Sequence, residues 1–166
     1  MGYSLGAGVA LQVAIRHPES VRKLVVVSTA FRRDGWYPEI LAAFDQMGPA
    51  TGEVVRHSPL GQLYPDVDWP GLFTKIGVLQ RKQFDWSKEV AAIKAPTLLV
   101  FADADSLRPA HMVEFYGLFG GGQRDAGWDG SGKPIAQLAI LPGQTHYDIG
   151  ASSALPPIVS RFLDDS

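Results

Sequence analysis

The pattern of apolar and polar positions changes its period along the chain. Over residues 5–16, LGAGVALQVAIR, apolar residues recur every three or four positions, as on one face of an amphipathic helix. Pro18 cannot continue that helix, and the β-branched run KLVVVS at 23–28 follows it. The first 28 residues therefore predict a helix that leads into a buried strand.

Two further apolar runs have the length of strands, PTLLVFA at 96–102 and IAQLAIL at 135–141. Segments with helical patterns stand around them, at 87–93, 109–118 and 153–163. Strands that alternate with helices are typical of a parallel sheet with helices packed on its faces. We therefore predict an α/β fold with a three-stranded parallel sheet and flanking helices.

One long segment, 32–86, contains no strand pattern. It holds two predicted helices, at 38–47 and 71–83, and many large apolar side chains. An insertion of this length with helices of its own is typical of a cap or lid rather than a loop. The predicted organisation is therefore an α/β core formed by 1–31 and 87–166, and a helical cap inserted at 32–86.

Composition narrows the function classes. The chain has 166 residues, a formal net charge of −2 and no cysteine. This charge favours neither nucleic acid nor an anionic membrane surface as a partner, and thiolate metal sites and disulfides are excluded. No apolar run approaches the roughly 20 residues of a membrane span. We expect a cytoplasmic protein with a small-molecule substrate and with no metal and no cofactor.

The first candidate for chemistry stands at the start of the chain, where residues 2–6 read GYSLG. The pattern G-x-S-x-G is that of the nucleophile elbow, a sharp strand-to-helix turn that exposes a serine hydroxyl. The glycines, Gly2 and Gly6, are expected to keep side chains out of the turn. Ser4 is then the candidate nucleophile, and the backbone N–H of Leu5 is a candidate donor to an oxyanion.

A nucleophilic serine needs a base, and the base needs an orienting acid. In open α/β sheets the reacting groups gather beyond the carboxyl ends of the strands. His146 follows the third predicted strand, and Asp103 and Asp105 follow the second. The chain order Ser, Asp, His is the order given for α/β-hydrolases. The remaining histidines are interpreted as structural: His17, His57 and His111.

Three segments together resemble the C-terminal portion of the α/β-hydrolase fold family: GYSLGAGVALQVAIRHP, PTLLVFADADSLRP and LAILPGQTHYDI. That family includes small serine esterases, cofactor-free haloperoxidase-like enzymes and C–C bond hydrolases. In it the acid is the last aspartate of a G-D-x-D-like turn, which matches Asp105. Asp103 is then a turn-stabilising residue, and Ala102 stands where the family's turn usually has glycine.

The resemblance implies a Ser4–His146–Asp105 triad that hydrolyses a small ester or related acyl compound through an acyl-enzyme. C–C bond hydrolysis or perhydrolysis on the same triad is the alternative among enzymes. A catalytically silent partial domain is the alternative outside enzymes. The serine nucleophile argues against haloalkane dehalogenases and epoxide hydrolases, which resemble this pattern but use aspartate there.

The resemblance also implies that parts of the fold are missing. Only Met1 precedes the elbow, although an elbow follows a strand, and the loop that supplies a second oxyanion donor is not in the sequence. We therefore expect a truncated chain with little hydrolase activity. We also expect 23–28 to be an exposed sheet edge through which the chain associates with itself.

Overall fold

The computed structural model describes residues 1–164. The chain divides into two compact units. The first combines Met1–Trp36 with Asp85–Ser166, and the second is Tyr37–Phe84. The second unit lies inside the segment 32–86, whose role as a cap stays a prediction.

The first unit is built on a parallel four-stranded sheet with the order β1-β2-β3-β4. The predicted fold class is confirmed, but the predicted number of three strands is wrong. The additional strand is β1, whose two residues pair with the end of β2, and a strand this short has no period to detect. The strands are β1 (Gly2–Tyr3), β2 (Leu24–Val27), β3 (Thr97–Ala104) and β4 (Ala136–Thr145).

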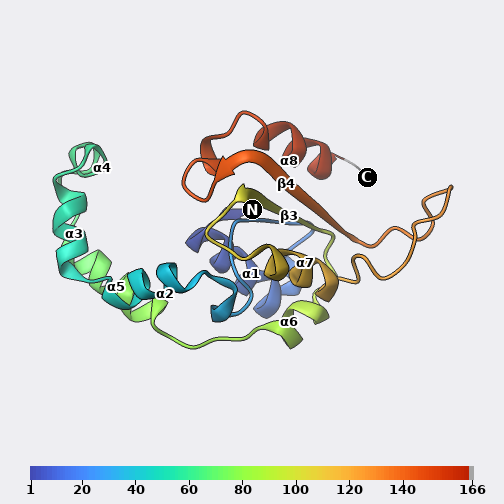
Figure 1. Cartoon of the computed structure of the whole chain (residues 1–166), viewed down its shortest axis with the longest axis horizontal. Coiled ribbons are helices and arrows are strands. Elements are labelled where there is room, and N and C mark those ends of the chain that lie inside the picture. The colour runs from blue at the N-terminus through green and yellow to red at the C-terminus, as the bar shows by residue number, and fades with distance from the viewer. Residues whose placement is uncertain (165–166) are drawn as a thin grey trace. The chain divides into compact units, whose positions relative to one another are not determined.

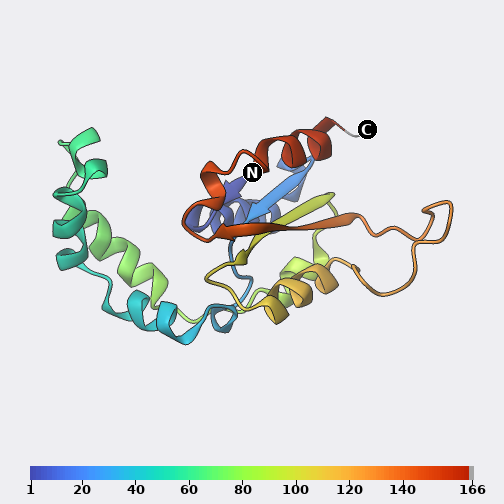
Figure 2. The same cartoon turned by 45° about the horizontal axis from the view of Figure 1, so that its top comes forward.

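Helices cover both faces of this sheet, as Figures 1 and 2 show. On one face α8 packs against alternate residues of β2 and β3, among them Val25, Val27 and Leu98. On the other face α1 lies against β2, while α6 contacts both α1 and α7. These helices are α1 (Leu5–Arg16), α6 (Ser87–Ala92), α7 (Pro109–Leu118) and α8 (Leu155–Asp164). Three short 3₁₀ turns are η1 (Pro18–Ser20), η2 (Arg33–Gly35) and η3 (Ile149–Ala151).

The second unit contains four helices where the sequence predicted two. They are α2 (Pro38–Gln46), α3 (Pro49–Arg56), α4 (Pro59–Leu63) and α5 (Trp69–Gln80). The prediction missed α3 and α4, because both begin with proline and contain glycine, residue types that are typical of turns and loops. A glycine permits close packing of α3 on α5, because a Cβ at Gly52 would lie 2.4 Å from the Trp69 carbonyl oxygen. This unit therefore has a packing core of its own.

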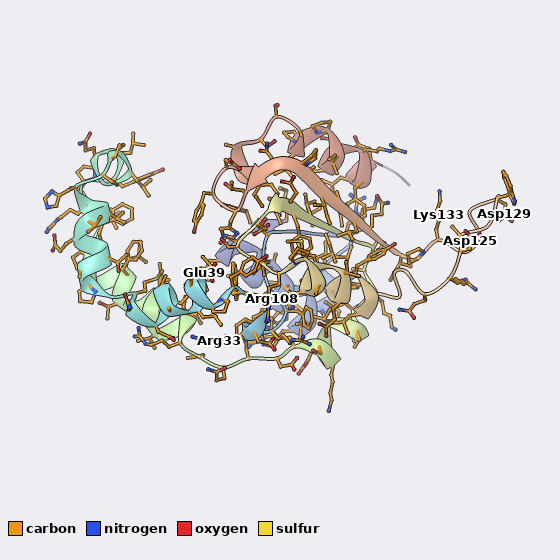
Figure 3. The ribbon with its side chains drawn as sticks, in the orientation of Figure 1. Arg33, Glu39, Arg108, Asp125, Asp129 and Lys133 are labelled. Carbon is orange, nitrogen blue, oxygen red and sulfur yellow. The ribbon has the colours of Figure 1, made fainter. Side chains whose placement is uncertain are left out.

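The glycine-rich segment 123–133 connects α7 to β4 and projects from the sheet (Figure 3). Its carboxylates accept backbone hydrogen bonds within the loop. Asp125 accepts one from Gly127 N–H at 2.8 Å, and Asp129 accepts one from Ser131 N–H at 3.0 Å. The aspartates therefore stabilise turns within this loop.

The edge of the sheet differs from the prediction. The segment 23–28 is not a bare edge, because Val26 and Val27 pair with β1 and the side chains of β2 are buried. The pairing with β1 stops before Leu24, however. A groove of about 380 Å³ lies beside this end of β2, and it is lined by Met1, Ala10, Val13, Ser20, Val21, Arg22, Lys23, Leu24 and Leu163.

We still expect the chain to self-associate at micromolar concentration, through this groove and the short edge strand. Val13, on α1, lines the groove and is 40% exposed, so Val13→Glu should shift the protein toward the monomer. Val113→Glu on α7 is the matched control, because Val113 is 59% exposed and does not line the groove. Light scattering measures the average mass of each variant in solution. A wild-type chain that is a stable monomer with a cooperative melt would contradict the expected self-association.

Candidate active site

Ser4 stands at the turn between β1 and α1 in a strained backbone conformation, with φ 50° and ψ −120°. Its N–H donates to the Val27 carbonyl at 2.9 Å, which fixes the turn to the end of β2. Gly2 is required here, because a Cβ would lie 2.1 Å from the Gly6 carbonyl oxygen. The expectation for Gly6 is wrong, since a Cβ there would meet nothing within 4 Å. The turn itself has the geometry of the predicted elbow.

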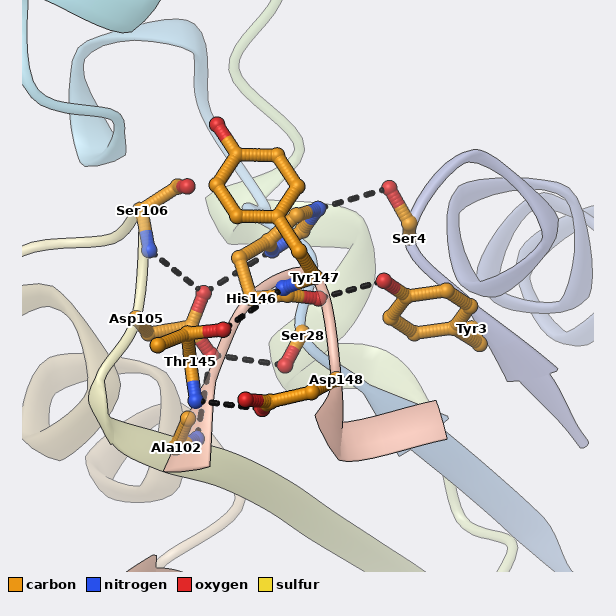
Figure 4. A network of polar contacts seen from close by, with 10 residues as sticks. All are labelled: Tyr3, Ser4, Ser28, Ala102, Asp105, Ser106, Thr145, His146, Tyr147 and Asp148. Carbon is orange, nitrogen blue, oxygen red and sulfur yellow. Dashed lines mark hydrogen bonds and ion pairs between the residues drawn. The ribbon is translucent and has the colours of Figure 1, made fainter. Parts of the chain in front are cut away.

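The structure brings Ser4, His146 and Asp105 into one chain of hydrogen bonds (Figure 4). Ser4 Oγ lies 3.0 Å from His146 Nε2, and His146 Nδ1 lies 2.9 Å from Asp105 Oδ1. An ionised carboxylate only accepts, so Nδ1 carries the proton of a neutral His146 and Nε2 accepts from the Ser4 hydroxyl. This is the arrangement that a base needs in order to take a proton from Ser4.

Asp105 lies just beyond the end of β3 and is buried, with 7% of its surface exposed. Oδ1 also accepts from Ser106 N–H at 2.8 Å. Oδ2 accepts from the Ser28 hydroxyl at 2.6 Å and from Ala102 N–H at 3.1 Å. Burial raises the pKa of Asp105, but the hydrogen bonds from His146, Ser28 and Ala102 outweigh it and hold the pKa below its usual value. The carboxyl group is therefore ionised at neutral pH.

Asp103 has a different environment, although it is only two residues away. Its carboxylate is exposed and accepts from Gly143 N–H at 3.0 Å and from Gln144 N–H at 3.2 Å. These backbone hydrogen bonds, that from Gly143 first, lower the pKa of Asp103. They tie the end of β3 to β4, and the structure places Asp105, rather than Asp103, against His146.

Three aromatic rings surround the imidazole of His146, whose residue surface is 8% exposed. The ring centroids of Tyr3, Trp36 and Tyr147 lie 5.7, 5.4 and 5.5 Å from that of His146. The Tyr3 hydroxyl also donates to the His146 carbonyl oxygen. Burial and the negative charge of Asp105 raise the pKa of Tyr3, which keeps this donor protonated. Tyr3, on the strand before Ser4, therefore contacts both the backbone and the ring of His146.

Sequence reasoning did not identify Ser28 or Tyr3 as site residues. Ser28 directly follows β2, so the rule that singled out residues after strands applies to it as well. Tyr3 occupies a variable position of the elbow pattern, and no signal in the sequence marks it. The contacts of both residues are with parts of the chain far away in sequence.

The other histidines lie outside the hydrogen-bonded chain. His111 is buried on α7, where its Nε2 accepts from Phe31 N–H at 3.3 Å and its ring stacks on that of Phe31 at 4.2 Å. Burial lowers the pKa of His111 to about 4. His17 is exposed beside Glu19, and His57 directly follows α3. These placements agree with their structural interpretation.

The backbone N–H of Leu5 is the first amide of α1. The first N–H groups of a helix have no partner within the helix, and the helix dipole favours negative charge beside them. Because Leu5 follows Ser4 directly, its N–H is placed to meet an oxyanion formed on an acyl group attached to Ser4.

Within residues 1–164, no group of three or more His, Cys, Asp and Glu side chains is arranged to hold a metal ion. None of the helices in the described part of the chain combines the length and the apolar character needed to cross a membrane.

No protein-family model matches the chain. A pimeloyl-[acyl-carrier protein] methyl ester esterase of Neisseria meningitidis serogroup B, serotype 15, is 31% identical over 149 residues, which cover 69% of this chain and 54% of that protein. Among solved structures, the enol-lactonase from Burkholderia xenovorans LB400 is similar with a TM-score of 0.63 at 18% identity, over 99% of this chain and 64% of the other. MGS-M2, an alpha/beta hydrolase enzyme from a Medee basin deep-sea metagenome library, has a TM-score of 0.58 at 19% identity, with 99% and 64% coverage.

At these identities the solved structures show the fold alone. Together with the curated relatives they confirm the resemblance seen in the sequence, and the chain belongs to the α/β-hydrolase fold family. The chain spans about half the length of the curated relatives it matches, 44% of one and 54% of another.

Proposed function

We propose that the protein is a serine hydrolase that cleaves a small ester or a related acyl compound through an acyl-enzyme. The observation that carries this proposal is the chain of hydrogen bonds from Ser4 Oγ through His146 to Asp105, at 3.0 and 2.9 Å. The strained elbow that presents Ser4 supports it as well, because such strain gathers at catalytic residues. The curated relatives, which include methyl ester esterases, support an ester as the substrate class.

In the proposed reaction Ser4 Oγ attacks the carbonyl carbon of the ester while His146 Nε2 takes its proton. The negative charge on the carbonyl oxygen is stabilised by the Leu5 N–H. The imidazolium of His146 is stabilised by the Asp105 carboxylate, and it then gives its proton to the leaving alcohol. Water, activated by the same histidine, hydrolyses the acyl-enzyme and restores the Ser4 hydroxyl.

We also propose that the 166-residue chain is a slow catalyst. Oxyanion sites normally have two donors, and Leu5 N–H is the one we identify within residues 1–164. Loss of one donor lowers the rate by roughly 100- to 1000-fold. Turnover of this chain should therefore lie well below the roughly 10 per second of an ordinary enzyme.

The test is the reaction of Ser4 itself. A fluorophosphonate probe should label the purified chain, and mass spectrometry should locate the adduct on the peptide that contains Ser4. Release of p-nitrophenol from p-nitrophenyl acetate should be abolished in Ser4→Ala, because the variant has no nucleophile. The melting temperature should hardly change, because the substitution keeps the Cβ of Ser4 and removes only its hydroxyl.

Ser160→Ala is the matched control, because Ser160 is an exposed serine on α8 outside the site. Labelling and p-nitrophenol release should both persist in that variant. Turnover retained in Ser4→Ala, or an adduct on another serine, would refute the proposal.

A further inference from the structure

Two residues other than glycine have a positive φ within residues 1–164, and both belong to the network around His146. Ser4 is the candidate nucleophile, and the other is Ser28, also with φ 50°. Such a conformation is costly for a residue with a Cβ, and it persists where the surrounding structure enforces it. Ser28 takes no direct part in the steps of the proposed reaction.

Ser28 is completely buried at the end of β2, and its backbone N–H donates to the Val100 carbonyl of β3 at 2.9 Å. This bond fixes Ser28 beside the strand that leads to Asp105. Its hydroxyl donates to Asp105 Oδ2 at 2.6 Å. Glycine would adopt this φ without strain but would supply no hydroxyl, so the backbone turn alone does not explain a serine here.

The two oxygens of Asp105 have separate partners, as Figure 4 shows. Oδ1 accepts from His146 and from Ser106 N–H, whereas Oδ2 accepts from Ser28 and from Ala102 N–H. Without the Ser28 hydroxyl, Oδ2 would keep only the longer bond from Ala102, at 3.1 Å. The carboxylate could then rotate about its side-chain bond and turn Oδ1 away from His146.

We propose that Ser28 is a positioning residue, whose hydroxyl holds Asp105 Oδ2 so that Oδ1 faces the Nδ1–H of His146. It acts on Ser4 through Asp105 and His146 and does not touch substrate. In neutral His146, the hydrogen bond to Oδ1 selects the tautomer with the proton on Nδ1, and this leaves Nε2 free to accept the proton of Ser4. Loss of the hydroxyl should therefore change the tautomer of His146 and slow the acylation of Ser4.

The tautomer is measured by nitrogen-15 NMR of the full chain labelled in histidine, with His146→Gln to assign the signals of His146. Wild-type His146 should be the Nδ1–H tautomer at a pH where the ring is neutral. Ser28→Ala should show a mixture of the two tautomers. Acylation by p-nitrophenyl acetate should slow by about 10-fold with an unchanged KM, the effect of one hydrogen bond to a charged group.

Two variants separate positioning from general destabilisation. Ser28→Gly also removes the hydroxyl but suits the positive φ, so it should fold and should change the tautomer as Ser28→Ala does. Thr97→Val removes a buried hydroxyl that donates to the Ala95 carbonyl at the opposite end of β3, and it should leave both tautomer and rate unchanged. An unchanged tautomer in the Ser28 variants would overturn the inference.

The effect on rate rests on the proposed function, but the effect on the tautomer does not. If Ser4→Ala retained acylation, the proposed function would fail while the NMR measurement still decided the role of Ser28. If Ser4→Ala were inactive and Ser28→Ala acylated at the wild-type rate, the positioning role would be refuted and the proposed function would stand.

Discussion

Asp105→Asn is expected to lower the rate of Ser4 acylation by roughly 1,000- to 10,000-fold. The amide has the shape of the carboxylate, but it carries no charge to stabilise the imidazolium of His146. Its NH₂ group can also donate to Nδ1, which would hold His146 in the tautomer whose Nε2 cannot accept the proton of Ser4. The measurement is the rate of p-nitrophenol release, with Ser4→Ala as the blank.

Asp103→Asn is the matched control for this change. Asp103 is exposed and binds the backbone of Gly143 and Gln144, so the substitution should alter the acylation rate by no more than about two- to threefold. The assignment of the acid would be wrong if the two variants lost activity equally, or if Asp103→Asn lost more.

The second large effect concerns stability in acid and comes from His111. Burial lowers its folded pKa to about 4 from the ordinary value of 6.5, so between these values the unfolded chain binds a proton that the folded chain does not. The free energy of unfolding should therefore be highest above pH 6.5, as far as His111 determines it, and should fall as the pH drops toward 4. The loss from this one residue should approach about 3 kcal/mol.

Urea unfolding at pH 7.5 and pH 4.5 measures this loss. His111→Gln should be less stable than the wild type at pH 7.5, because the buried ring and its stacking on Phe31 are lost. Its stability should, however, fall less between the two pH values. His17→Gln is the control, since His17 is exposed and should leave the pH dependence as it is. If the free energy of unfolding fell equally in the wild type and in His111→Gln between the two pH values, His111 would not be the cause of the acid sensitivity.

Both effects depend on the hydrogen-bond partners of a buried titratable side chain, one just beyond β3 and the other on α7. Asp105 stays ionised because several donors meet it, whereas His111 stays neutral because its Nδ1 has no hydrogen-bond partner within residues 1–164. Burial opposes the charged form at both positions. The polar partners decide which of the two groups carries a charge at neutral pH.

Local sequence patterns were sufficient for much of the first unit. The bounds of α1 and α7 were predicted to the residue, because a helical period followed by Pro18 and a proline at the start of α7 are local signals. The β-branched runs likewise located β2 and β3. The G-x-S-x-G pattern selected Ser4, and the rule that functional side chains follow strands selected His146 and the pair Asp103 and Asp105, of which the family resemblance favoured Asp105. The structure joins Ser4, His146 and Asp105 by hydrogen bonds.

Other features required the tertiary structure. β4 runs to Thr145, beyond the apolar run, because Ala104 pairs with Thr145 and Asp103 binds Gly143 and Gln144. The two residues of β1, which pair with the end of β2, are too few to show a period, and proline and glycine obscured the helices α3 and α4. In these elements the neighbours in space, rather than the residue types along the segment, determine the conformation.

The sequence by itself determined the class of fold, which follows from periodicity. It also determined the residues that carry the proposed chemistry, which follow from the G-x-S-x-G pattern, from position after a strand and from the family resemblance. Only the tertiary structure decided how those residues are held. Ser28 reaches Asp105 across 77 positions of sequence, and Tyr3 reaches the loop of His146 across 143. A hydrogen bond between such distant residues does not appear in the pattern of apolar and polar residues of either segment. It depends on the folded backbone that brings the two segments together.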